Sequence, residues 1–65
     1  MDLQQAITEI KKGITEIFLD EELLPNLEYI GEDLNIKHKP KYCGTKNGKS
    51  WFVIKYKTKT INIYA

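Results

Sequence analysis

Apolar residues recur at helical spacing through the first eighteen positions of the chain. The apolar stripe steps by four, three, four and three residues through Leu3, Ile7, Ile10, Ile14 and Ile17. This spacing predicts an amphipathic helix that runs as far as Phe18, with Asp2 as its N-cap and Gly13 in its interior. The same spacing fits a coiled-coil seam, but two heptads are too few for one, so we expect the stripe to pack against a sheet.

The segment from Leu19 to His38 mixes apolar residues with residues that break helices and strands. Asp20 is placed to cap one further helical turn. We expect Pro25 to end that turn, because proline disfavours helical geometry in the residue before it. Beyond it, the short segments 26–31 and 33–38 are predicted as strands separated by a turn, forming either a small hairpin or one bent strand.

The second half of the chain predicts a β-hairpin. The Asn47–Gly48 dipeptide is the signature of a type I′ turn, since both residue types tolerate positive φ. A regular ladder around this turn pairs Tyr42 with Val53. The same ladder pairs Cys43 with Phe52.

Side chains alternate between two faces in the strand that follows the turn. One face is the more apolar and carries Phe52, Ile54 and Tyr56. The other face carries Trp51, Val53, Lys55 and Lys57. Residues 60–64 read as a final short strand. If the apolar face packs on the helix, Trp51 and the two lysines face solvent, as does Tyr42 in the expected register.

These elements predict an α+β fold in which an N-terminal amphipathic helix packs on a small antiparallel sheet of three or four strands. The 65 residues allow one domain, residues 1–65. A chain of this length buries only about 60% of its unfolded surface, which leaves self-association as a homodimer open.

Charge is divided unevenly along the chain. All nine acidic residues lie at or before Asp33, with only Lys11 and Lys12 to offset them, and the remaining eight of the ten lysines follow. This asymmetry favours an anionic partner. The alternative interpretation is that the two halves complement each other's charge within one small fold. Arginine is absent, and lysine is a point charge without bidentate geometry, so binding through these residues is expected to contact phosphates with little base reading.

The segment after residue 36 combines eight lysines with several aromatic residues and no acidic residue, which is typical of single-stranded nucleic-acid binding. The expected nucleic-acid-binding residues are Lys37, Lys39, Lys41, Tyr42, Lys46, Lys49, Trp51, Lys55, Lys57 and Lys59. Two alternative interpretations stand beside this one. Lysines on strand edges protect a sheet from pairing with its neighbours, and Trp51 is large enough to be needed in the core.

Catalytic and metal-binding chemistry finds little support in the sequence. His38 and Cys43 are too few for a closed zinc site, and five residues apart they are expected on opposite faces of a regular strand. No catalytic motif is present, so we expect no enzymatic activity, no cofactor and no metal. The alternative to nucleic-acid binding is a protein-interaction module, either a homodimer or a small inhibitor of a protein partner of the phage or mobile-element kind.

The single cysteine excludes an internal disulfide and favours a reducing compartment. Neither a signal peptide nor an apolar run of membrane-spanning length is visible. A cytoplasmic location without membrane contact is therefore expected.

Overall fold

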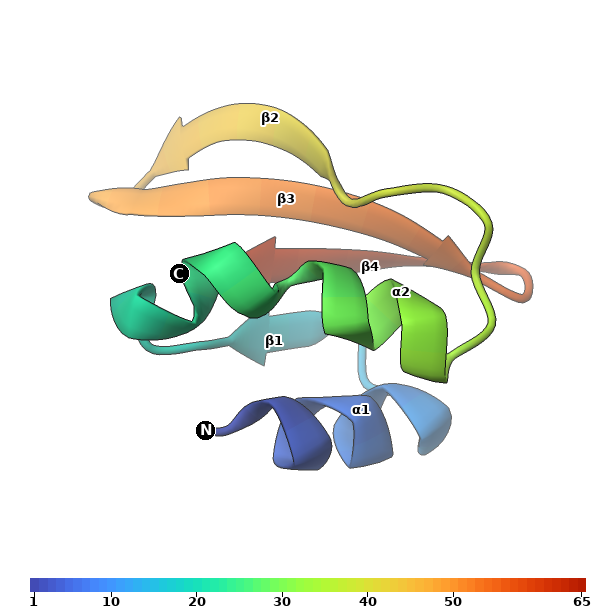
Figure 1. The fold of residues 1–65 in the computed structure, drawn as a ribbon. Coiled ribbons are helices and arrows are strands. Elements are labelled where there is room, and N and C mark those ends of the chain that lie inside the picture. The colour runs from blue at the N-terminus through green and yellow to red at the C-terminus, as the bar shows by residue number, and fades with distance from the viewer.

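The computed structural model describes all 65 residues and contains three helices and four strands. In chain order these are α1 (Leu3–Lys11), β1 (Glu16–Phe18), the 3-10 helix η1 (Glu21–Asn26), α2 (Glu28–Asp33), β2 (Lys41–Lys46), β3 (Lys49–Tyr56) and β4 (Lys59–Tyr64). The strands form one sheet in the order β1-β4-β3-β2, and the helices lie together on one side of it (Figure 1).

The fold class predicted from the sequence is confirmed. An N-terminal helix packs on a small sheet of four strands, of which β2, β3 and β4 are antiparallel. The strand β1 adds a parallel edge beside β4, so the sheet is mixed.

The first helix is shorter than its apolar stripe predicts. Asp2 caps it as expected, since its carboxylate accepts a hydrogen bond of 2.7 Å from the N–H of Gln5. The helix ends after Lys11 in a Schellman motif: the Gly13 N–H donates to the Ile10 carbonyl, and the Ile14 N–H donates to the Glu9 carbonyl. Gly13 has φ +103°, a conformation open to glycine because it has no Cβ.

The predicted continuation of the helix from residue 14 to Phe18 is therefore wrong. Ile14 is exposed in the turn, whereas Ile17 lies in β1 and is fully buried. Ile17 pairs with Ile63 of β4. Its spacing from Ile14 fits a helix, but the residue lies in a strand.

The strands predicted at residues 26–31 and 33–38 are also wrong, because residues 28–33 form α2 and residues 34–38 form a turn and loop. Leu27, Ile30 and Leu34 are buried at spacings of three and four, which is the periodicity of one helix face. Pro25 lies inside η1 and the chain continues into α2. Proline has no N–H to donate to the carbonyl of Glu22, but helical bonding resumes at Leu27, whose N–H donates to the Leu24 carbonyl.

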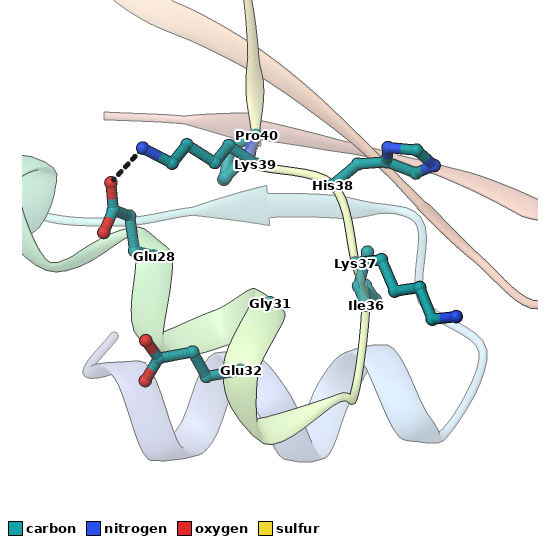
Figure 2. A pocket seen from close by; sticks show the side chains of 8 residues that line it. All are labelled: Glu28, Gly31, Glu32, Ile36, Lys37, His38, Lys39 and Pro40. Atoms are coloured by element: carbon teal, nitrogen blue, oxygen red, sulfur yellow. Dashed lines mark ion pairs between the residues drawn. The ribbon is translucent and has the colours of Figure 1, made fainter.

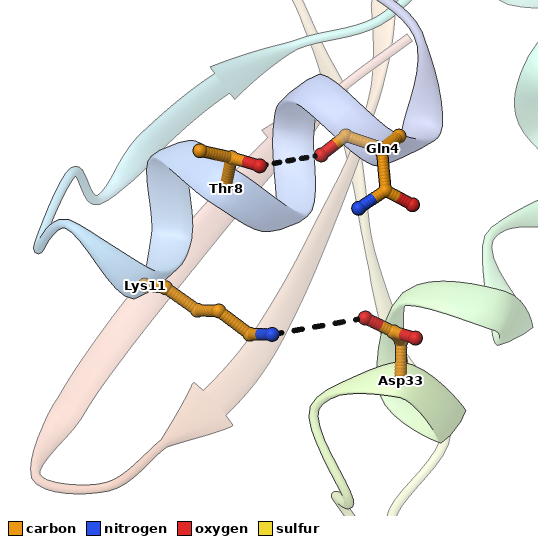
Figure 3. Close-up of polar contacts among 4 residues, drawn as sticks. All are labelled: Gln4, Thr8, Lys11 and Asp33. Carbon is orange, nitrogen blue, oxygen red and sulfur yellow. Dashed lines mark hydrogen bonds and ion pairs between the residues drawn. The ribbon is translucent and has the colours of Figure 1, made fainter.

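The core lies between the sheet and the helices. Its twelve buried residues are Ala6, Ile7, Ile10, Ile17, Leu19, Leu27, Ile30, Leu34, Ile54, Ile61, Ile63 and Ala65. The two α-helices also meet at their surfaces, where Lys11 Nζ lies 3.9 Å from Asp33 Oδ2 (Figure 3). Both of those side chains are about half exposed, so this ion pair contributes little to stability.

The central hairpin forms at the predicted turn. Asn47 and Gly48 have φ of 53° and 78°, as a type I′ turn requires. Next to the turn, β2 and β3 pair in the predicted register. The register changes at a β-bulge between Tyr42 and Gly44. One extra residue in β2 shifts the pairing, so Tyr42 lies opposite Phe52 and the predicted pairing with Val53 is wrong.

Candidate functional site

One side of the sheet has no secondary structure element over it. Ile54 of β3 and Ile61 and Ile63 of β4 point to the helices. Side chains alternate along a strand, so the residues next to these isoleucines point to the other side of the sheet. We call this other side the open face. Alternation and register place on it Glu16, Phe18, Lys41, Lys46, Lys49, Trp51, Val53, Lys55, Thr60, Asn62 and Tyr64.

A row of aromatic rings crosses three strands of the open face. Phe18 of β1 is paired with Tyr64 of β4, and Tyr64 is paired with Trp51 of β3. The rings of Phe18 and Tyr64 are stacked, with centroids 5.0 Å apart and planes 22° from parallel. Phe18 is 57% exposed, while Trp51 is half-buried and Tyr64 is buried. The ring of Phe18 is therefore available for stacking with a planar ligand, and its contact with Tyr64 holds it in place.

A hydrogen-bonded network fixes the side chains around this row. Trp51 Nε1 donates to Asn62 Oδ1 at 3.0 Å, and Asn62 Nδ2 donates to Glu16 Oε2 at 2.7 Å. Because an indole N–H only donates, the amide oxygen of Asn62 faces Trp51 and its nitrogen faces Glu16. The Tyr64 hydroxyl donates to Glu16 Oε1 at 3.0 Å, so both carboxylate oxygens are engaged.

The same network changes the acidity of Tyr64. Burial of the phenol raises the pKa of Tyr64 above its ordinary value, since burial disfavours the charged phenolate. The hydrogen bond to Glu16 and the negative charge of that carboxylate raise the pKa further. Tyr64 therefore keeps its proton, and can donate to Glu16, up to a higher pH than an ordinary tyrosine.

Four lysines share the open face with the aromatic row, two beside it and two farther along the sheet. Lys46 Nζ lies 5.8 Å from the ring centroid of Trp51 and 5.7 Å from that of Tyr64, within cation–π distance of both. Lys49 lies opposite Lys46 across the hairpin, Lys41 lies opposite Val53, and Lys55 follows on β3. All four lysines are exposed, and none of them forms an ion pair with a carboxylate.

Charge is segregated between the two layers of the fold. Glu16 is the one carboxylate of the open face. The others belong to the helices or directly adjoin them: Asp2, Glu9, Asp20, Glu21, Glu22, Glu28, Glu32 and Asp33. The acidic first half of the sequence thus becomes the helical layer, and a basic surface remains on the opposite side of the sheet.

The ten residues expected to bind nucleic acid do not share one surface. Five of them meet on the open face: Lys41, Lys46, Lys49, Trp51 and Lys55. Tyr42 lies on the helix side of the sheet, where its ring is 5.3 Å from that of Phe52. It is 57% exposed because the helices do not extend over β2. Trp51 and Tyr42 therefore cannot form a common stacking surface.

The remaining four expected residues lie off the open face or at its ends. Lys37 and Lys39 belong to the loop before β2, where Lys39 Nζ reaches back to within 3.6 Å of Glu28 Oε1 (Figure 2). Lys57 lies in the β3–β4 turn with its Nζ 5.4 Å from the ring centroid of Tyr56. Lys59 donates to the Gly13 carbonyl at 3.4 Å.

Four residues of the aromatic row and its hydrogen-bonded network were missed by the sequence-based prediction: Glu16, Phe18, Asn62 and Tyr64. Tyr64 and Asn62 alternate with the buried Ile61 and Ile63, so the period of β4 was a usable signal. Phe18 had no such signal, because the stripe before it has helical spacing.

Two hollows border the open face. One of about 310 Å³ is lined by Glu16, Phe18, Lys46, Asn47, Lys49 and Tyr64. The other, of about 320 Å³, includes both His38 and Cys43, contrary to the expectation that they diverge. His38 precedes β2, so strand alternation does not apply to it. Nowhere do three or more His, Cys, Asp or Glu side chains gather as metal ligands.

Comparison of the chain with protein-family models, with curated proteins and with solved structures finds no match. None of the helices has the length and apolar character that crossing a membrane requires. Fold and site together define a small α+β protein whose uncovered sheet face carries lysines around an aromatic row.

Proposed function

We propose that the chain is a non-enzymatic binding module whose open face contacts single-stranded nucleic acid. The observation that carries this proposal is the composition of that face, on which four lysines free of ion pairs accompany Phe18, Tyr64 and Trp51. Lysines attract the phosphate backbone, and exposed rings stack on unpaired bases. Both groups occur on one surface without a covering helix.

The two kinds of side chain have separate roles in this proposal. Phe18 provides the stacking surface, because it is the most exposed ring of the row and its plane is fixed by Tyr64. Lys46 and Lys49 flank the β2–β3 turn beside it and are placed for the neighbouring phosphates. Lys41 and Lys55 extend the positive charge along the sheet.

The location proposed for this function is the cytoplasm. Cys43 is an exposed free thiol, which suits a reducing compartment, and nucleic acid is present there.

Salt dependence of binding tests the electrostatic part. A labelled single-stranded oligonucleotide of about ten nucleotides is titrated with protein at about 50 and about 200 mM salt, with fluorescence anisotropy as the measurement. If four phosphates are neutralised, the log–log slope of affinity against salt is expected near −3, from about −0.7 per phosphate. Absence of binding at the lower salt concentration eliminates the proposal.

Matched lysine variants test whether binding depends on the lysines of the open face or only on the total charge of the chain. The double substitution Lys46→Gln with Lys49→Gln removes two positive charges from the open face. The control, Lys12→Gln with Lys37→Gln, removes two exposed lysines from the helix side. The open-face variant is expected to reduce the salt slope by about 1.4, at about 0.7 per lost phosphate contact, while the control leaves it unchanged. Equal effects of the two variants argue against a defined surface.

Matched aromatic variants test the stacking part. Phe18 and Tyr42 are both 57% exposed, but they lie on opposite faces of the sheet. Phe18→Ala is expected to weaken binding about tenfold, since stacking is worth about 1–3 kcal/mol per base. Tyr42→Ala is expected to leave binding unchanged, and a larger effect of Tyr42→Ala places the contact on the other face.

A protein partner is the second candidate, and two exposed tyrosines outside the open face favour it. Tyr29 on α2 is 59% exposed and Tyr42 on β2 is 57% exposed, and aromatic rings are enriched in protein interfaces. Self-pairing through the free edge of β2 is opposed by Lys41, Lys46 and the bulge, which protect edges from strand addition. Light scattering at high protein concentration tests the homodimer, and a monomer there removes it.

A further inference from the structure

We infer that the hollow at the Phe18 end of the open face takes one base of the bound strand and selects guanine through the Glu16 carboxylate. This inference rests on the proposed nucleic-acid function. It goes further by giving that function a base preference, which the lysines alone do not supply.

The hollow has the parts that a base-binding site needs. Its volume of about 310 Å³ lies at the lower end of the range for ligand pockets, about 300–1,000 Å³. The exposed ring of Phe18 forms one wall, on which a flat base can stack. Lys46 and Lys49 line the same hollow and are available to the phosphates on either side of that base.

Glu16 supplies the polar group that distinguishes one base from another. Each of its oxygens already accepts one hydrogen bond, from Asn62 or from Tyr64, and this holds the carboxylate in one orientation. A carboxylate has about four lone-pair positions, so about two are left. Glu16 is exposed and lines the hollow, which makes those positions accessible to a ligand.

An ionised carboxylate only accepts hydrogen bonds, so it favours the base with the most donors on one edge. Guanine presents two adjacent donors, N1–H and the N2 amino group, which match two carboxylate oxygens. Adenine and cytosine present one amino group next to an acceptor nitrogen. Thymine and uracil present a single N–H between two carbonyl oxygens, which the carboxylate repels. The expected order is guanine, then adenine and cytosine, then thymine.

The negative charge of Glu16 also has a cost that makes the inference testable. A carboxylate on a face that binds phosphates repels the backbone, whichever base is bound. Glu16→Gln is therefore expected to strengthen binding of an all-thymine strand while it abolishes the preference for guanine. A general loss of structure weakens binding to every strand and cannot produce these two opposite changes.

The experiment uses all-thymine oligonucleotides of about ten nucleotides in which one central position is dT, dC, dA, dG or deoxyinosine. The wild-type chain is expected to bind the dG strand about tenfold more tightly than the dT strand. Deoxyinosine lacks the N2 amino group, so it is expected to lose much of this gain. Glu32→Gln, which removes the same charge from the exposed surface of α2, is the control and is expected to keep the preference.

The outcomes separate this inference from the proposed function. Equal binding of all five strands by the wild-type chain overturns the guanine preference and leaves the nucleic-acid function standing. Retention of the preference in Glu16→Gln overturns the role of Glu16. If no strand binds at low salt, the proposed function itself fails and the inference fails with it.

Discussion

Lys59 Nζ lies 3.4 Å from the carbonyl oxygen of Gly13, which follows the C-cap of the first helix. The two residues are 46 positions apart, so this contact joins the acidic first half of the chain to the basic second half. A cation is favourable at this position because the C-terminal end of a helix carries partial negative charge. One lysine of the basic half is therefore used within the fold, while others remain available on the open face.

Replacement of Gly13 by alanine is expected to destabilise the chain by about 1–2 kcal/mol, because alanine is strained at positive φ. A Cβ there also comes within 2.9 Å of the Lys59 ammonium, which has to move. Gly31→Ala is the control, since Gly31 lies in α2 with only ordinary contacts around the added carbon. It is expected to stabilise α2 by up to about 1 kcal/mol. Urea denaturation measures the free energy of unfolding of both variants. Changes of the same sign in the two variants contradict the prediction.

The two isoleucines at the end of the apolar stripe are expected to differ sharply when truncated. Ile17→Ala is expected to cost about 3 kcal/mol, because Ile17 is fully buried between β4 and the helices. Ile14→Ala is expected to cost less than about 1 kcal/mol, because Ile14 is 42% exposed. Thermal and chemical denaturation give both values. Similar losses at the two positions are expected only if the helix continues past Gly13.

Removal of the Asn62 side chain is expected to loosen the open face. Asn62→Ala takes away the acceptor of the Trp51 indole and one donor to Glu16, at a cost of about 1 kcal/mol. Tryptophan fluorescence is expected to shift towards the emission of an exposed indole. Thr60→Ala is the control, since Thr60 lies two residues earlier on the same face and its side chain makes no hydrogen bond. An equal effect of the two variants shows that the network contributes nothing.

Stability is expected to fall in alkaline solution through Tyr64. The pKa of Tyr64 is raised in the folded chain, first by burial and then by Glu16, whereas the unfolded chain keeps the ordinary value of about 10. Above that pH the folded state holds a proton that the unfolded state has released, so the free energy of unfolding decreases as pH rises through the folded pKa. Below the ordinary value the contribution is fully present.

Tyrosinate absorbance checks this directly. One of the four tyrosines of the wild-type chain is expected to ionise later than the others, and Tyr64→Phe is expected to remove that late step. Glu16→Gln is expected to move the step to lower pH, because it removes the carboxylate but not the burial. A late step that persists in Tyr64→Phe assigns it to another tyrosine.

Local rules allowed part of the fold to be predicted. The type I′ turn at Asn47–Gly48 depends on two backbone angles that those residues favour, and the two faces of β3 follow from strand alternation. Leu27, Ile30 and Leu34 have helical spacing, although the segment that contains them is predicted as strands. The site could be predicted only in part. Five of the ten expected residues lie on the open face, and the other five do not.

The amino-acid sequence is sufficient to predict the hairpin turn, the strand periods, the helix cap at Asp2 and the division of charge between the two halves. These features depend on residues a few positions apart. Long-range packing pairs β1 with β4, which places Phe18 on Tyr64 and Glu16 beside Asn62. It also decided which lysines share a face. Such pairings join residues about 46 positions apart and depend on the burial of Ile17 and Ile63, which no local pattern records.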